Sequence, residues 1–162
     1  MIRVLTVLAI AMCTSPAIAA QISGRGKAID STTIEIGDQR IMLFGIDSVM
    51  RKQSCLLDGK RWLCWQSAVD NLQKLLDQGT AVCDPVGEPD IFGRVLARCT
   101  VNGQSVNEQM VAQGYAVARP KETKDYVAAE TAAKNQKVGL WRGEFIQPKE
   151  FRRASGIMVD RP

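Results

Sequence analysis

The chain has 162 residues, of which 46% are hydrophobic and 23% charged, a composition typical of one globular domain and not of a disordered chain. Lys and Arg number 21 against 17 Asp and Glu, and the formal charge of +4 is compatible with an anionic partner. The sequence contains no histidine, which excludes Ser-His-Asp or Cys-His catalysis and any His-ligated zinc site. Catalysis would have to use carboxylates, arginine, lysine or a metal held by carboxylates.

Residues 1–19 are predicted to form a secretory signal peptide. Arg3 precedes an aliphatic run from Val4 to Met12, and Ala17-Ile18-Ala19 matches the small-x-small cleavage pattern. The alternative, an N-terminal membrane anchor, is disfavoured because the apolar run is too short to span a bilayer. We therefore expect a secreted or periplasmic protein that is monomeric and free of the membrane after cleavage. Its domain would cover residues 20–153, followed by a tail over residues 154–162.

Four cysteines remain after cleavage, and an even number in an exported chain indicates two disulfides with three possible pairings. A Cys55–Cys64 bond would close a short loop, and a Cys83–Cys99 bond would join two strands predicted to be neighbours. We favour these pairings over a zinc site because no CxxC spacing is present and export favours oxidation.

The first half of the chain predicts a three-stranded meander over residues 26–30, 32–36 and 40–46, followed by a loop over residues 47–61. A helix should follow and end at Gly79. Its apolar positions recur at steps of three and four: Trp62, Trp65, Val69, Leu72 and Leu76.

The second half predicts strands over residues 80–83 and 92–99 and an extended segment over residues 115–118. A capping box of Ser105 and Glu108 opens a short helix, and residues 125–136 form an Ala-rich one. The tail from Phe145 shows no clear pattern. This order favours a mainly β, α+β fold with a small five-stranded barrel and three α-helices, rather than a sandwich.

Six short stretches, in order over residues 22 to 153, resemble the staphylococcal nuclease (thermonuclease) family. They are Ala28-Ile29-Asp30, Ile41 to Asp47, Phe92 to Ala97, Val106-Asn107-Glu108, Gln113 to Ala116 and Gly139-Leu140-Trp141. The resemblance implies an oligonucleotide-binding (OB) barrel and a secreted, Ca²⁺-dependent phosphodiesterase acting on DNA and RNA. In that chemistry carboxylates hold calcium, a glutamate assists the attacking water, and two arginines stabilise the transition state.

The charged positions of the family are only partly retained. Asp47 stands at one calcium-ligating position, Ser48 beside it would lend its carbonyl, and Arg94 stands at one arginine position. Thr32, Met42 and Met50 occupy the positions of the other aspartate, the other arginine and the general-base glutamate. Calcium affinity follows ligand charge and number, so the resemblance predicts a calcium site that is weak or absent, and impaired catalysis.

Two hypotheses follow. The first is a binding module for single-stranded DNA or RNA, or another anionic polymer, with little or no catalysis. The second is an active endonuclease with a rearranged metal site, in which Arg40, Arg51 and Lys52 compensate for the lost side chains. Candidate contacts in either case are Arg40, Arg51, Lys52, Phe92, Arg94, Tyr115, Arg119 and Lys121.

Overall fold

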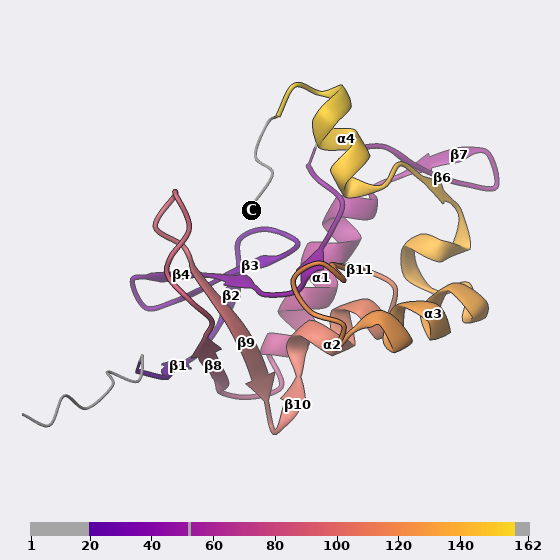
Figure 1. The fold of residues 1–162 in the computed structure, drawn as a ribbon. Helices are drawn as coiled ribbons and strands as arrows, with labels where there is room; N and C mark the ends of the chain where they lie inside the picture. The colour runs from indigo at the N-terminus through magenta and orange to yellow at the C-terminus, as the bar shows by residue number, and fades with distance from the viewer. Residues whose placement is uncertain (1–19, 52, 158–162) are drawn as a thin grey trace, which may run out of the picture.

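The computed structural model describes residues 20–51 and 53–157, so the predicted signal peptide lies outside the described residues. The described chain is a mixed α+β fold (Figure 1). Its strands are β1 (Ile22–Gly24), β2 (Lys27–Ala28), β3 (Thr33–Ile36), β4 (Gln39–Leu43), β5 (Ile46–Asp47), β6 (Cys55–Leu57), β7 (Lys60–Trp62), β8 (Ala81–Pro85), β9 (Val95–Val101), β10 (Gln104–Ser105), β11 (Val117–Ala118) and β12 (Glu144–Phe145). Its helices are α1 (Cys64–Leu76), α2 (Val106–Ala112), α3 (Val127–Gln136) and α4 (Pro148–Ala154), with a 3₁₀ turn at Gly139–Arg142.

The main sheet has the strand order β1-β8-β9-β4-β3-β2, and β10 also pairs with β9. Strands β4 and β9 are parallel, and the other ladders of this sheet are antiparallel. Among the described residues no ladder joins β1 to β2, so hydrogen bonds do not close the sheet into a barrel. The mixed α+β class is confirmed, whereas the detail of a closed five-stranded barrel with three helices is not.

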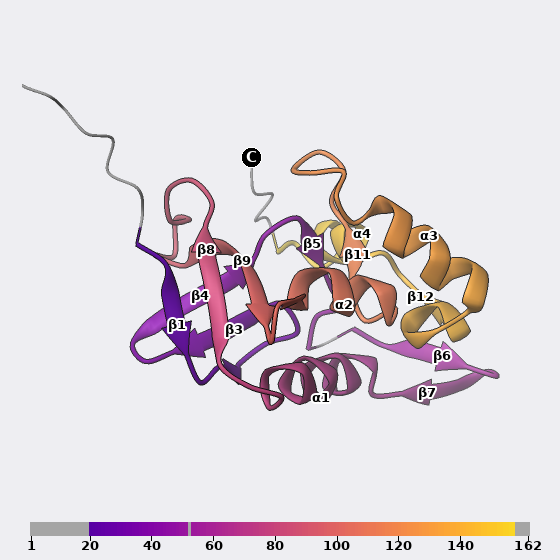
Figure 2. The same ribbon diagram turned by 90° about the horizontal axis from the view of Figure 1, so that it is seen from below.

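The main core lies between this sheet and the helices (Figure 2). Ile34, Ile41 and Leu43 point from β3 and β4 into the interior and are fully buried. Leu72 and Leu76 come from the predicted apolar stripe of α1 and join the same cluster. The helical spacing seen in the sequence is therefore the contact face of α1.

The segment predicted as a loop over residues 47–61 contains an antiparallel β6–β7 hairpin. Trp62 ends β7 and lies outside α1, so its assignment to the helical stripe is wrong. The type of the turn explains the hairpin, since Asp58 and Gly59 both adopt positive φ angles as a tight hairpin turn requires. The hairpin belongs to a second core cluster that consists of Val49, Cys55, Cys64, Ala68 and Leu140.

The segment from Phe145, in which the sequence shows no clear pattern, contains regular structure. β12 pairs with β6, and α4 follows it with Pro148 at its first turn, Glu150 near its N-terminus and Arg152 and Arg153 in its last turn. These placements suit the helix dipole, but seven residues are too few for an independent helix. Helix α4 therefore depends on tertiary contacts.

Two disulfides join Cys55 to Cys64 and Cys83 to Cys99, as the sequence predicts. The first fastens the β6–β7 hairpin to the start of α1, and the second crosses the directly paired residues of β8 and β9. Over residues 20–51 and 53–157, no helix is long and apolar enough to cross a membrane.

Candidate functional site

One cavity of about 160 Å³ brings together most of the positions that the sequence singles out. It lies where the turn after β2, strands β4 and β5, the loop before β9 and helix α4 meet. Its lining residues are Asp30, Ser31, Thr32, Met42, Asp47, Ser48, Met50, Phe92, Arg94, Arg119, Arg152 and Ile157. The predicted ligand, arginine and glutamate positions thus converge in space although they are far apart in the sequence.

Asp47 is the central charged group of this cavity and is only 7% exposed. It ends β5, which pairs with β11 and so faces Val117. Both carboxylate oxygens accept hydrogen bonds from Arg152, Oδ1 from Nη1 at 2.9 Å and Oδ2 from Nη2 at 2.5 Å. The Ser48 backbone N–H also donates to Oδ1 at 2.9 Å. The carboxylate is therefore held in a two-pronged, charge-assisted pair by a residue 105 positions further along the chain.

Arg119 provides a second cation next to Asp47, with Nη1 3.8 Å from Oδ2. Its Nε lies 2.7 Å from Glu122 Oε1, and its backbone N–H donates to the Gly45 carbonyl. Gly45 has φ +77°, and a Cβ there would lie 2.5 Å from Thr123. Only glycine fits this turn, which carries the chain from β4 to Asp47 and anchors the segment that holds Arg119.

The positions that would complete a calcium site do not supply further carboxylates. Thr32 stands in the cavity at the position of the other ligating aspartate. The carboxylate of Asp30, which also lines the cavity, accepts hydrogen bonds from the Ser31 backbone and hydroxyl and from the Trp65 indole. Within the described residues, no three His, Cys, Asp or Glu side chains are grouped so that they could hold a metal. A calcium ion prefers six to eight oxygens, so this donor set, with Asp47 already paired to a guanidinium, does not fit the ion.

Arg94, the retained arginine, is paired within its own loop. Its Nη2 and Nε lie 2.6 and 2.8 Å from Asp90 Oδ2, and the backbone N–H groups of Phe92 and Arg94 donate to Oδ1. Burial by itself raises the pKa of Asp90, but the hydrogen bonds and charge of Arg94, with the Phe92 N–H, outweigh it and lower the pKa below its ordinary value. The Arg94 side chain therefore lines the cavity while it is already paired with Asp90.

Aromatic rings and guanidinium groups meet at two places around the cavity. Phe92 is 60% exposed, and the Arg94 guanidinium lies 5.2 Å from its ring centroid. The Arg51 guanidinium lies 4.7 Å from the ring of Trp65, whose indole reaches Asp30. These pairs offer flat apolar faces next to positive charge.

The remaining predicted residues are dispersed. Arg40 sits opposite Glu35 in the β3–β4 ladder and is not among the residues lining the cavity, so it does not replace the arginine lost at Met42. Tyr115 is half-buried, packs against both core clusters and is not among the residues lining the cavity. Lys121 lies in the neighbouring groove between β11 and α4. Lys52 lies outside the described residues.

Three contributors to the site were not predicted for it: Asp90, Trp65 and Arg152. Asp90 precedes Phe92-Gly93-Arg94 in a pattern typical of an Asx turn, a signal the sequence does carry. Trp65 belongs to the apolar stripe that the sequence predicts for α1, and it packs against the second core cluster, but its indole N–H also reaches Asp30. Arg152 has no local signal, because its role exists only when α4 meets β5.

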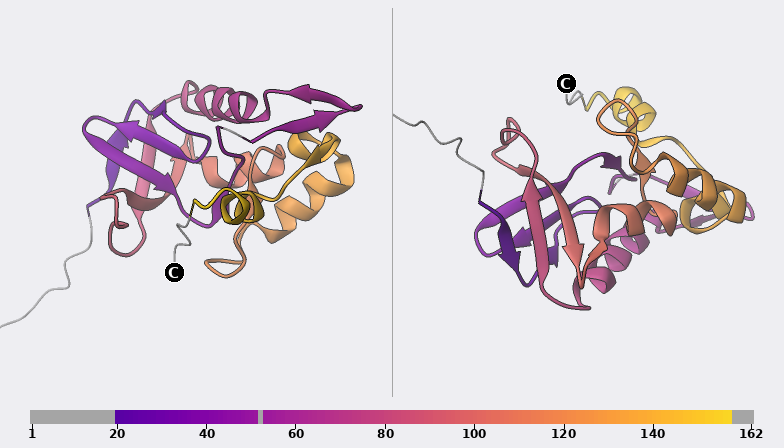
Figure 3. Two further views of the ribbon diagram at one scale, coloured as in Figure 1. Left: turned by 90° about the horizontal axis from the view of Figure 1, so that it is seen from above. Right: turned by 60° about the horizontal axis from the view of Figure 1, so that its bottom comes forward.

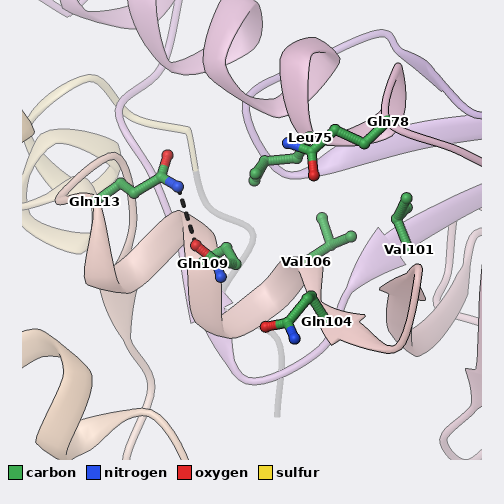
Figure 4. A pocket seen from close by; sticks show the side chains of 7 residues that line it. All are labelled: Leu75, Gln78, Val101, Gln104, Val106, Gln109 and Gln113. Atoms are coloured by element: carbon green, nitrogen blue, oxygen red, sulfur yellow. Dashed lines mark hydrogen bonds between the residues drawn. The ribbon is translucent and has the colours of Figure 1, made fainter.

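A second, smaller cavity of about 90 Å³ lies between α1 and α2 (Figure 4). Four glutamines line it, and Gln113 donates to Gln109 at 3.0 Å across its rim. It contains no ionisable side chain and none of the predicted site residues. We therefore place the candidate functional site at Asp47.

The Asp47 cavity lies in an α+β domain, and sequence comparison gives the family of this domain. A match to the staphylococcal nuclease homologue family spans residues 40–143, and the chain belongs to this family. It is also 32% identical over 143 residues to the succinoglycan biosynthesis protein ExoI of Rhizobium meliloti (strain 1021). That alignment covers 85% of this chain and 74% of the relative.

Replacing Arg152 by glutamine should lower the free energy of unfolding by about 3 kcal/mol, because it leaves the largely buried Asp47 without its main counter-charge. Arg153→Gln, on the exposed side of the same helix, is the control and should change stability by less than about 0.5 kcal/mol. In denaturant titrations, the double variant Asp47→Asn/Arg152→Gln should lose less than the sum of the single variants. Equal stability of the two single arginine variants would contradict the assignment.

The Asp90–Arg94 pair should make stability depend on pH. Because the folded-state pKa of Asp90 is lowered, its contribution is complete above the unfolded value of about 3.9 and is lost as the pH falls through the folded value. The difference in unfolding free energy between the wild type and Asp90→Asn should therefore be largest above about pH 4 and shrink in more acidic solution. A difference that stays constant from pH 6 to pH 2 would show that the charge of Asp90 is not what stabilises this loop.

Proposed function

We propose that this protein is a catalytically impaired member of the nuclease family that binds single-stranded nucleic acid without cleaving it. The observation that carries the proposal is the Arg152 guanidinium on both oxygens of Asp47, in a cavity where Thr32, Met42 and Met50 stand at the other catalytic positions. Arg152 supplies the positive charge that a calcium ion supplies in the family. We propose that calcium binding is weak or absent as a result.

The loss of catalysis follows from the chemistry that each missing group would supply. A general base contributes about 10²–10⁴ in rate, and Met50 cannot accept a proton. One oxyanion donor contributes about 10²–10³, and Met42 cannot donate a hydrogen bond. Arg94 remains, but Asp90 already accepts from its side chain.

Binding is supported by the surface around the cavity. Phe92 is exposed and Arg94 lies against its ring, while Arg51 lies against Trp65. Stacking of bases on aromatic rings, with cations contacting the backbone, is how proteins bind single strands without reading sequence. The excess of basic over acidic side chains, of which only Arg3 lies in the predicted signal peptide, adds a general attraction.

We further propose that the protein is exported and monomeric. The two disulfides support an oxidising compartment. The name of the relative, a succinoglycan biosynthesis protein, makes an acidic polysaccharide the natural competitor to nucleic acid as ligand. A polysaccharide therefore belongs in any test of binding.

The test is fluorescence anisotropy with a labelled 12-nucleotide single-stranded DNA, its RNA equivalent and labelled polygalacturonate. We expect the purified protein to bind the oligonucleotides, and Phe92→Ala to weaken binding by about fivefold or more, since stacking on one ring is worth about 1–3 kcal/mol. Ile91→Ala is the matched control, because Ile91 is 86% exposed in the same loop but does not line the cavity.

The same preparations are incubated with DNA and RNA in Ca²⁺, Mg²⁺, Mn²⁺ or EDTA, and the products are separated on gels. We expect no metal-dependent cleavage. Metal-dependent turnover that is lost in Asp47→Asn would replace the proposal by the active-endonuclease alternative. Binding of polygalacturonate alone would contradict the choice of nucleic acid.

A further inference from the structure

Next to the Asp47 cavity, a groove runs between the segment 117–122 and helix α4. Its volume is about 630 Å³. Both panels of Figure 3 show the loop after β11 close to α4. One wall consists of β11 and the residues after it up to Glu122, and the other consists of Gln147 and α4.

The charges in this groove are unequally matched. Five basic side chains line it against three acidic ones. Asp47 and Glu122 are engaged by Arg152 and Arg119. In the part of the chain that the structure describes, Lys121, Lys149 and Arg153 are exposed and form no ion pair. Of the lining acids, only Glu150 remains to offset these three cations.

The groove continues the Asp47 cavity, because Asp47, Arg119 and Arg152 line both. The exposed ring of Phe92 lies in the cavity lining, and the three unpaired cations line the groove. Helix α4, which supplies two of those cations, lies beyond the residues 40–143 that match the family.

We propose that the groove between residues 117–122 and α4 is the backbone-binding half of the nucleic-acid site, with Lys121, Lys149 and Arg153 contacting successive phosphates. This inference rests on the proposed function and adds the path that the bound nucleic-acid strand takes over the surface. A single strand entering the groove places its phosphates on the three cations, while its bases reach towards Phe92. The Asp47–Arg152 pair contributes by fixing α4 at the right distance to form the second wall.

The experiment measures binding of the 12-nucleotide DNA over a range of salt concentrations, with the variant Lys121→Gln/Lys149→Gln/Arg153→Gln. All three residues are exposed, and thermal melts check that the variant stays folded. We expect affinity at 50 mM salt to fall at least tenfold. The slope of log K against log[salt] should become shallower by about 2, since each phosphate contact on a single strand contributes about 0.7.

The matched control is Lys27→Gln/Lys60→Gln/Lys74→Gln, which removes the same charge from exposed positions on β2, β7 and α1. Its slope should stay close to that of the wild type. Equal effects of the two triple variants on affinity and slope would overturn the assignment of the groove as the backbone-binding surface. The proposed function would still stand in that case if Phe92→Ala weakens binding. No binding of DNA or RNA by the wild type would overturn both.

Discussion

The ion pair between Asp47 and Arg152 is the interaction on which the rest of the site depends. Asp47 is nearly inaccessible to water, and a buried carboxylate requires a counter-charge. The resemblance to calcium-dependent nucleases implies that an ion would meet this requirement, whereas here the Arg152 guanidinium from α4 meets it. The same contact that neutralises Asp47 also brings α4 against the cavity and creates the groove beside it.

Several independent contacts place α4 where Arg152 can reach Asp47. β12 pairs with β6 opposite Cys55, and the disulfide from Cys55 to Cys64 fastens β6 to the start of α1. The Gln53 amide donates to the Ile146 carbonyl just before α4 begins. A seven-residue helix that would not form alone is thereby held in place. The disulfide thus has a part in the functional site as well as in stability.

The sequence predicts best those features that are determined by residues close together along the chain. The apolar stripe of α1 and the strands around Ile34 and Ile41 follow from local spacing. The Cys83–Cys99 pairing follows from the two strands being neighbours, and the Cys55–Cys64 pairing from the short loop that it closes. The β6–β7 hairpin was missed because its charged residues resemble a loop, although Asp58-Gly59 signals a hairpin turn. Arg152 could not be found in this way, since its partner lies 105 residues earlier and α4 has no independent stability.

The central claim is that Arg152, and not a divalent cation, is the counter-charge of Asp47. The most direct test is a crystal structure of the protein grown in millimolar calcium chloride. The claim predicts the Arg152 guanidinium against both oxygens of Asp47, with α4 in place and no ion between them. A calcium ion bound to Asp47, with Arg152 displaced, would contradict it.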